Sequence, residues 1–595
     1  MRNFPPQYNL QENDALYFPH IPKTAGMTFR TILEDQFPCE DTCPATLKAQ
    51  FQHITSEELK RYRLYRGHLS YIDIPGIVSA EKRVVNVTVL REPVARVISH
   101  YEYIRRMPGD PHYEAVKEMS LEEFAYKLPV GKVGKNVQVY YVAKLLKYNL
   151  HRVPPEETLA IAKESLDQFA FVGLLERFQD SLFLLSYIFG WKPILNSRKE
   201  NAASSPTKKL SETIPESTLE AIRENTLLDK ELYSYAEEIF TQRFDAMVQD
   251  LVEKYGRLVE TPEPLSPDTK PNSEILRQLL ELHAQERYRQ LHLPPSTAAI
   301  YDFCQPLRGI GWQRRECPDN PEDPAYRWIG PGTEASLDLP VNAGDETEFH
   351  LELRAICTWL IPSDLLESLT VEVNGHPIAL YTLYRDPGVK LMQGKVSAEV
   401  IAAAEPFATV KLWANRSVPI NSLNPLSNDT RSVAIACNYI HIFPATQEPQ
   451  KSASLLLFQD PIWQEAGDFV EKRLEPGEKV AAPLAFKARL AREVQDSADF
   501  LQDHQAFDWV IIHKSMTDRV MPMLFRLVWN GFGPVFANDV FLIFSKQPGA
   551  KRLSYLAPHV RSLYLGRIKT YTRFYFERLL KPWVKRKLDS IGQNS

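Results

Sequence analysis

The chain has 595 residues, of which 44% are hydrophobic and 24% charged, and its formal net charge at pH 7 is −5. At roughly 150 residues per domain this length corresponds to about three to five domains, and the composition excludes disordered, collagen-like and disulfide-scaffold proteins. A charge so near balance argues against a polyanion binder along the whole chain, and six cysteines indicate a reducing compartment.

The N-terminal sequence has no basic segment followed by an apolar run, as a secretory signal would have. The most apolar stretch, residues 181–195, is shorter than the ~18 apolar residues of a membrane-spanning helix and contains polar positions. We therefore expect a soluble, cytoplasmic protein, with a peripheral membrane contact left open.

The first predicted unit, residues 14–37 (DALYFPHIPKTAGMTFRTILEDQF), is a strand, a turn and a helix. The strand-like run ends at Pro22, and the helix after residues 23–28 carries its apolar residues at helical spacing. A strand–turn–helix directs backbone N–H groups and the positive end of the helix dipole at one point. This arrangement predicts a phosphate site.

Four residues of the turn and the first helical turn have suitable chemistry for a phosphate. Lys23 adds a mobile charge, Gly26 lets the backbone approach closely, and Thr24 and Thr28 offer hydroxyl donors. The turn differs from a nucleotide triphosphatase loop, G-x-x-x-x-G-K-[ST], because the lysine precedes the glycine and the leading glycine is missing. The alternative is a solvated turn before an ordinary helix.

A histidine in a second turn is the candidate general base. In residues 63–74 (RLYRGHLSYIDI), His68 follows Gly67 and precedes an apolar run. Imidazole titrates near neutral pH, so a reachable histidine can take a proton from a hydroxyl group. A purely structural histidine is the alternative.

The next predicted strand and helix place an arginine at a strand end. In residues 83–106 (RVVNVTVLREPVARVISHYEYIRR), the β-rich run ends at Arg91, and Pro93 fits the first turn of the following helix. Open α/β sheets bind ligands at the carboxyl ends of their strands. Arg91 and Ser99, two helical turns further on, are therefore candidates to hold a second phosphate. The alternative is a salt bridge for Arg91 and a solvent-facing Ser99.

In this order the three elements resemble the sulfotransferase superfamily, in particular the carbohydrate sulfotransferases related to heparan sulfate and uronyl 2-O-sulfotransferases. The resemblance covers about residues 14–250. HIPKTAGMTF matches the 5′-phosphosulfate loop of the family, LREPVARVISHY its 3′-phosphate element, and RGHLSYIDI the segment whose histidine is the catalytic base. FVGLLERFQDSLFLL resembles a later family segment that packs against the core.

The resemblance implies a P-loop-like α/β domain that moves a sulfuryl group from 3′-phosphoadenosine 5′-phosphosulfate (PAPS) to a hydroxyl of a carbohydrate acceptor, without a metal. It assigns catalysis to His68, the general base, and to Lys23, which stabilises the leaving phosphate. An in-line transfer needs mainly positioning and charge stabilisation, which these residue types supply. The residues that it implies for PAPS binding are Lys23, Thr24, Ala25, Gly26, Met27, Thr28, Arg91, Ser99 and, from a loop that family members often fold over the donor, Lys208.

The sequence departs from the heparan enzymes in two ways. Their acceptor-binding residues cannot be mapped from these motifs, so specificity for uronic acid is not implied. Those enzymes are Golgi membrane proteins, whereas here we expect no anchor or signal and a long extension after the catalytic domain. A cytoplasmic enzyme of bacterial type fits this layout.

The rest of the chain changes in composition several times. A segment rich in Pro, Ser and Thr, residues 261–274, predicts a linker, and short alternating runs follow, with a hairpin signal at Asn374-Gly375. We predict a multidomain chain with a sulfotransferase domain (1–258), a linker and helix (259–298), a β-sandwich that is a candidate carbohydrate-binding domain (299–447), a small α/β domain (448–548) and a basic aromatic tail (549–595).

Residues 551–595 contain eleven Lys and Arg against two acidic residues, with aromatic residues interleaved. Such a helical tail suits an anionic membrane surface or an acidic polysaccharide, or equally the acidic body of its own chain.

Two rival functions are compatible with the sequence. One is a non-catalytic assembly protein that binds a glycan or a membrane surface and carries a degenerate sulfotransferase domain. The other is an ATP-dependent phosphotransferase, but the sequence shows neither the Walker loop nor the carboxylate pair for Mg²⁺ that such an enzyme uses. We expect no nucleic-acid partner.

Overall fold

The computed structural model describes most residues between 8 and 561. They fall into two compact units: unit 1 is Met1–Ala343, Val371–His376 and Val400–Ala434, and unit 2 is Gly344–Thr370, Pro377–Glu399 and Ile435–Ser595. The described residues are 8–51, 54–69, 82–127, 134–144, 150, 152–195, 214–261, 265, 271–291, 295–317, 325–385, 388–424, 427–446, 461–483, 486, 489–490, 494–496, 500, 503, 505–514, 523–524 and 526–561.

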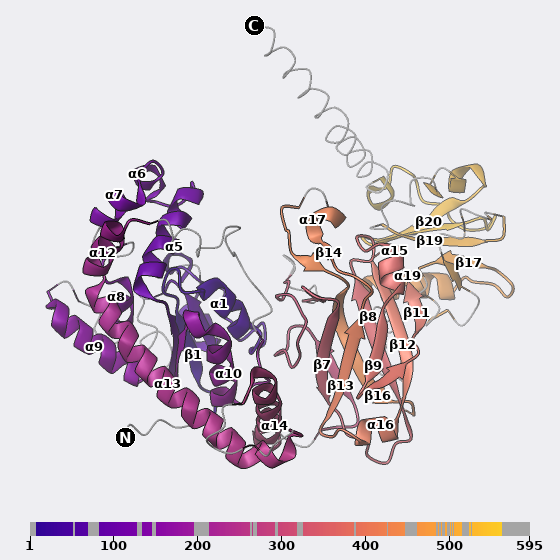
Figure 1. Cartoon of the computed structure of the whole chain (residues 1–595). Coiled ribbons are helices and arrows are strands. Elements are labelled where there is room, and N and C mark those ends of the chain that lie inside the picture. The colour runs from indigo at the N-terminus through magenta and orange to yellow at the C-terminus, as the bar shows by residue number, and fades with distance from the viewer. Residues whose placement is uncertain are drawn as a thin grey trace, which may run out of the picture. The chain divides into compact units, whose positions relative to one another are not determined.

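A parallel four-stranded sheet that contains β1 organises the N-terminal part of unit 1 (Figure 1). Its strand order is β2-β1-β3-β4. Its strands are β1 (Ala15–Pro19), β2 (Leu64–Gly67), β3 (Val84–Leu90) and β4 (Phe171–Leu174). β1, β2 and β4 are buried along their whole length, as is usual for parallel strands covered by helices. The predicted α/β fold and strands β1, β3 and β4 are confirmed, whereas β2 was not predicted.

Helices pack around this sheet, and α10 and α13 contact β4 directly. The described helices of this part are α1 (Gly26–Glu34), α2 (Lys48–Phe51), α3 (Ser56–Arg61), α5 (Pro93–Arg106), α6 (Tyr113–Val116), α7 (Leu121–Tyr126), α8 (Val137–Ala143), α9 (Pro155–Asp167), α10 (Phe178–Phe189), α12 (Glu216–Asn225), α13 (Leu227–Tyr255) and α14 (Ser273–Leu291), with 3₁₀ turns η1 (Leu175–Arg177) and η2 (Gly256–Leu258).

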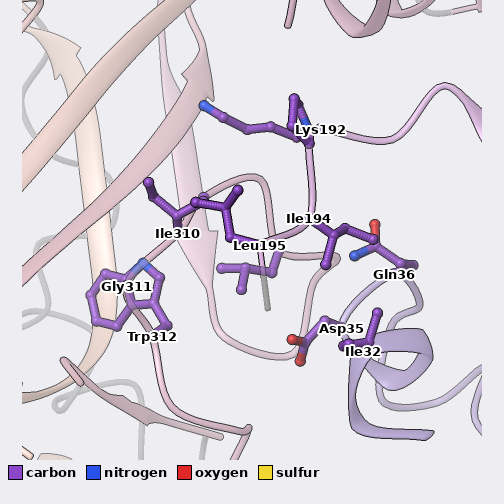
Figure 2. A pocket seen from close by; sticks show the side chains of 12 residues that line it. Ile32, Asp35, Gln36, Lys192, Ile194, Leu195, Ile310, Gly311 and Trp312 are labelled. Atoms are coloured by element: carbon purple, nitrogen blue, oxygen red, sulfur yellow. The ribbon is translucent and has the colours of Figure 1, made fainter. Parts of the chain in front are cut away.

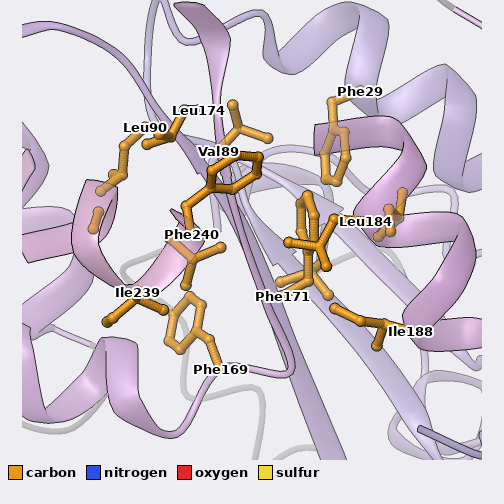
Figure 3. Close-up of a cluster of buried hydrophobic side chains, with 14 of the residues drawn as sticks. Phe29, Val89, Leu90, Phe169, Phe171, Leu174, Leu184, Ile188, Ile239 and Phe240 are labelled. Carbon is orange, nitrogen blue, oxygen red and sulfur yellow. The ribbon is translucent and has the colours of Figure 1, made fainter. Parts of the chain in front are cut away.

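The core between sheet and helices holds α1 in place. Figure 3 shows Phe29 of α1 beside Phe171 of β4, with ring centroids 5.7 Å apart and ring planes 14° apart. Leu184 of α10 and Phe240 of α13 complete the same buried cluster. Burial of such side chains contributes about 1.5–3 kcal/mol each. The start of α1 is thereby fixed beside the carboxyl end of β1.

An antiparallel sheet in the order β10-β9-β13-β7 lies mostly in unit 1. Its strands are β7 (Glu334–Pro340), β9 (Thr370–Val373), β10 (His376–Ile378) and β13 (Phe407–Trp413). Asn374 and Gly375 join β9 to β10 with φ of 48° and 81°, as a two-residue hairpin turn requires, which confirms the predicted hairpin. Shorter elements are β5 (Ala299–Asp302), β6 (Arg327–Trp328), β14 (Val418–Pro419), α17 (Ile420–Leu423) and β15 (Ser432–Val433).

Unit 2 contains antiparallel strands in the order β11-β12-β8-β16 and a C-terminal mixed sheet in the order β18-β17-β19-β21-β20. In the mixed sheet β17 runs parallel to β18 and β19, and β21 runs antiparallel to β19 and β20. The elements are β8 (Glu348–Ile356), α15 (Ser363–Glu367), β11 (Tyr381–Arg385), β12 (Val389–Ser397), α16 (Ala398–Ala402), β16 (Ala436–Pro444), α19 (Pro461–Glu471), β17 (Val480–Ala482), β18 (Val494–Asp496), β19 (Trp509–His513), β20 (Gly533–Ala537) and β21 (Phe541–Ser545).

The multidomain organisation with later antiparallel sheets is confirmed, and the division into five segments stays a prediction. Most of the predicted basic tail, residues 562–595, lies outside the described residues. Within the part of the chain that is described, no helix has both the length and the apolar character needed to cross a bilayer.

Candidate active site

Three residues of the site follow three adjacent parallel strands. His20 comes directly after β1, His68 after β2 and Arg91 after β3, and the register pairs Pro19 with Gly67 at the ends of β1 and β2. The His20 N–H donates to the Gly67 carbonyl at 2.9 Å, so the two histidines leave the sheet side by side. Because the strands are parallel, their carboxyl ends share one edge of the sheet, where α/β proteins bind ligands.

The turn between β1 and α1 has an unusual backbone. Lys23 and Ala25 adopt positive φ angles of 72° and 60°, and the Thr24 hydroxyl donates to the Ile21 carbonyl at 3.0 Å, which closes the turn. α1 then begins at Gly26, and no side chain caps its N terminus. Its first N–H groups, with the positive end of the helix dipole, are therefore available to an anion.

His20 occupies the space that the absence of a side chain at Gly26 provides. A Cβ atom at Gly26 would lie 1.8 Å from the His20 imidazole. The buried His20 ring stacks on the His68 ring, with centroids 4.3 Å apart and planes 21° apart. Burial and the neighbouring charges, including Lys23, hold the pKa of His20 well below its usual value, so this ring stays neutral.

His68 is oriented by the backbone of the first turn. Its Nδ1 lies 3.1 Å from the His20 carbonyl oxygen, which can only accept a hydrogen bond, so Nδ1 carries the proton. In the neutral ring the lone pair then resides on Nε2. Gly67 makes this placement possible: its φ is +132°, and a Cβ there would lie 2.4 Å from the Thr46 carbonyl oxygen.

Lys23 places its ammonium group over α5. The Nζ atom lies 4.3 Å from the centroid of the Tyr103 ring. Partial burial, followed by the positive charges of Arg106 and Arg91, lowers the pKa of Lys23 to about 8. Because its surroundings disfavour the charged form, the Lys23 ammonium is stabilised more by a bound phosphate than an exposed lysine ammonium would be.

Arg91 is held next to Lys23. Gln138 of α8 brackets its backbone, accepting from the Arg91 N–H at 2.9 Å and donating to its carbonyl at 2.7 Å. The Arg91 Nη1 donates to the Lys23 carbonyl at 3.1 Å, while its buried Nε has no hydrogen-bond partner among the described residues. An unsatisfied buried guanidinium N–H is consistent with a site for an anionic ligand.

A layer of buried residues behind the site fixes Gln138. Asp229 of α13 accepts from the Val139 N–H at 2.9 Å, and Asn136 accepts from the Leu228 and Asp229 N–H groups at 3.0 and 3.1 Å. Burial raises the pKa of Asp229 to about 6, which the nearby Arg96 partly opposes. The start of α8, and with it the Gln138 amide, is thereby locked against α13.

The structure brings Lys23, His68 and Arg91 to one edge of the sheet. Ala25, Gly26, Met27 and Thr28 form the entry to α1, and the Thr24 hydroxyl is used inside the turn. Ser99 is half-buried on α5. Lys208 lies outside the described residues.

Sequence reasoning missed three contributors to the site: the His20 ring, Gln138 and Asp229. Of these three, only His20 has a signal in the sequence, because it lies just before the turn that contains Lys23 and Gly26.

Two cavities of unit 1 lie apart from this site. The one in Figure 2, of about 40 Å³, is lined by Ile32, Asp35 and Gln36 at the other end of α1. A larger one, of about 230 Å³, includes Trp191 and Arg308 in its lining. Neither of these two cavities is lined by Lys23, His68 or Arg91.

Comparisons with known proteins point to one enzyme class. No family model matches the chain. The chain is 29% identical to heparan-sulfate 6-O-sulfotransferase 2 of Gallus gallus over 41% of its own length and 70% of that protein. It is 26% identical to heparan-sulfate 6-O-sulfotransferase 1 of Cricetulus griseus and of Homo sapiens, over 40% of its length and 70% and 68% of theirs.

Among solved structures, a family 35 carbohydrate binding module from Clostridium thermocellum aligns with a TM-score of 0.15 and 12% identity, over 25% of this chain and 92% of that chain. A score this low carries no argument about fold or function. The finer likeness to the 2-O-sulfotransferases is not confirmed, because the relatives named here are 6-O-sulfotransferases. These relatives support a sulfotransferase family for the chain.

Proposed function

We propose that the chain is a PAPS-dependent sulfotransferase that transfers a sulfuryl group to a hydroxyl of a carbohydrate acceptor. The observation that carries the proposal is the meeting of Lys23, His68 and Arg91 beside the uncapped start of α1. The relatives are named for heparan sulfate, a glycosaminoglycan, which supports a carbohydrate as the acceptor class.

The residues present fit a donor with two separate anionic groups. The first N–H groups of α1 and the Lys23 ammonium would hold the 5′-phosphosulfate, and Arg91 with Ser99 would hold the 3′-phosphate. The buried Arg91 Nε without a partner supports this assignment, because a phosphate oxygen would satisfy it. PAPS supplies an activated sulfuryl group attached to a phosphate that can leave.

Each residue then has a defined task. Lys23 and the N–H groups at the start of α1 neutralise the charge that develops on the phosphate oxygen as its bond to sulfur breaks. His68 accepts the proton of the acceptor hydroxyl on Nε2 as that oxygen bonds to sulfur. His20 is a positioning residue: its carbonyl fixes the His68 tautomer and its neutral ring fixes the His68 ring plane.

The donor assignment is tested by calorimetric titration with 3′-phosphoadenosine 5′-phosphate (PAP) and, separately, with ADP. We expect PAP to bind more tightly, because only PAP places a phosphate at Arg91. Arg91→Ala should weaken PAP by about tenfold or more, the loss of a charge-assisted hydrogen bond of about 1.5–3 kcal/mol, and should leave ADP unchanged. Equal, weak heats for both nucleotides would remove the assignment.

The role of His68 is tested separately from binding. His68→Ala should keep the PAP affinity of the wild type and lose about 10²–10⁴-fold in turnover with a glycosaminoglycan acceptor, the usual contribution of a general base. Unchanged turnover in a variant that binds PAP normally would exclude His68 as the base.

A further inference from the structure

Three cysteines far apart in the sequence meet just beyond α1. Cys39 follows the helix, Cys304 follows β5, and Cys317 lies in the loop after it. The Cys39 thiol is within hydrogen-bonding reach of the thiols of both Cys304 and Cys317. None of the three forms a disulfide in this structure.

The backbone geometry is compatible with a covalent link. The Cys39 N–H donates to the Cys304 carbonyl at 2.9 Å. A backbone contact this short keeps the two Cα atoms within the roughly 4.4–6.8 Å that a disulfide spans. Cys39 can therefore bond to Cys304 without a large movement of either segment.

The three thiols differ in exposure and in charge. Cys317 is exposed, whereas Cys39 and Cys304 are half-buried. The hydrogen bonds from Cys39, supported by the charge of Arg315, lower the pKa of Cys304 and Cys317, while the pKa of Cys39 is raised. The lowered pKa favours the thiolate form of Cys304 and Cys317, whereas the raised pKa of Cys39 favours its thiol form.

Arg315 links this cluster to α1. Its guanidinium donates to the carbonyls of Glu34 at 2.9 Å, of Phe37 at 3.1 Å and of Cys304 at 3.1 Å. The same cation thus holds the Cys304 segment against the end of α1 and lies beside the thiols. An accessible thiolate next to a second thiol and a fixed cation is the arrangement of a reactive cysteine with a resolving partner.

We infer that Cys317, Cys39 and Cys304 form a thiol–disulfide site that reacts with small-molecule disulfides. The Cys317 thiolate attacks one sulfur of a disulfide such as oxidised glutathione, forming a mixed disulfide and releasing one glutathione thiolate. Cys39 then gives up its proton and attacks the Cys317 sulfur, which closes a Cys39–Cys317 disulfide and releases the second glutathione. Exchange with the Cys304 thiolate moves the bond to Cys39–Cys304 and restores the Cys317 thiolate.

Cys43 provides an internal control, because it lies four residues from Cys39 but differs from Cys317 in accessibility and in the direction of its pKa shift. It is fully buried, and burial raises its pKa. Its sulfur is neither accessible nor ionised at neutral pH, so it should not react.

The test uses the reduced full-length protein incubated with oxidised glutathione at pH 7.5, alkylated and digested without reduction, and analysed by peptide mass spectrometry. We expect peptides joined through Cys39 to Cys317 or Cys304, two hydrogens lighter than the separate peptides and separated again by dithiothreitol. Cys43→Ser should give the same product. An alkylated Cys39 in the treated wild type, with no joined peptide, would overturn the inference.

Two variants separate the roles of the thiols. Cys39→Ser removes the resolving thiol, so the reaction should stop at glutathione attached to Cys317. Cys317→Ser changes an exposed position that does not contribute to the core, so it should fold normally and form the Cys39–Cys304 bond at least tenfold more slowly. Glutathione attachment at Cys43 or Cys437 at a rate similar to that at Cys317 would show unspecific oxidation and would equally overturn the inference.

Discussion

The two ends of α1 differ in whether the protein itself supplies hydrogen-bond partners for the backbone groups there. At the N terminus no side chain caps the first N–H groups, and Lys23 lies three residues before the helix begins. At the C terminus Arg315 donates to the Glu34 and Phe37 carbonyls, and the Leu307 N–H donates to the Asp35 carbonyl at 2.6 Å. The protein thus supplies partners for carbonyl groups at one end itself, whereas no side chain caps the N–H groups at the other end.

The difference separates stability from function along a single helix. Satisfied groups at one end contribute to folding, whereas the uncapped N–H groups at the other end are available to bind an anion. Substitutions at the N-terminal end should therefore change binding and turnover, and substitutions at the C-terminal end should change stability. Three substitutions test this separation.

The largest effect is expected at Gly26. A Cβ atom there would lie 1.8 Å from the His20 imidazole, so Gly26→Ala must displace the ring that stacks on His68. A displacement of about 1 Å near reacting groups costs about 10²-fold in rate, so we expect kcat/KM for sulfotransfer to fall by about that factor. The matched control is Gly109→Ala, where an added Cβ meets nothing within 4 Å. Equal activities of the two variants would contradict the role of His20.

The second effect is expected at Arg315, at the other end of the helix. Arg315→Ala removes the charged donor from three carbonyls and should destabilise this end of α1 by about 2–3 kcal/mol. The measurement is native-state hydrogen exchange of the α1 amides in reducing buffer, where protection should fall by about 30–150-fold. PAP affinity should not change, and Arg315→Lys should recover part of the protection. If Arg315→Ala instead lost PAP affinity and kept normal hydrogen-exchange protection, the assignment of stability to this end of α1 would be wrong.

The smallest effect is the pH dependence that Lys23 imposes. With a pKa of about 8, Lys23 is mostly protonated at pH 7 and mostly neutral at pH 9. If only the ammonium form binds PAP, affinity is retained below pH 8 and falls by about tenfold between pH 7 and pH 9. Lys23→Arg keeps its charge over this range, so its PAP affinity should stay level in calorimetric titrations at both pH values. The same decline in the variant would assign the titration to another group.

Much of the sheet could be predicted from the sequence, because β1, β3 and β4 are short apolar runs bounded by turn residues. β2 escaped prediction because it contains Arg66, which is buried in the fold. Arg66 is tolerated there because its Nε donates to Glu34 at 2.7 Å. This ion pair joins a strand to a helix 32 positions away, and local periodicity carries no sign of it.

The residues of the site likewise divide into those that could be predicted from the sequence and those that could not. Lys23 and Arg91 could be predicted because each follows a predicted strand, and His68 because it follows Gly67 in a predicted turn. Gln138 could not, since its contact with Arg91 spans 47 positions and nothing in its local sequence marks it. The stacking of His20 on His68 also depends on the pairing of β1 with β2, and β2 itself was not predicted.

Arg315 has a further consequence for how the chain is made. It stands 281 positions after Glu34, so at ribosomal rates of about 5–20 residues per second the nascent helix waits on the order of tens of seconds for this partner. During that interval the early sheet must keep α1 docked through its apolar face and the ion pair between Arg66 and Glu34. An N-terminal fragment released before Arg315 is translated would keep the uncapped N terminus of α1 and lack the Arg315 hydrogen bonds at the C terminus of that helix.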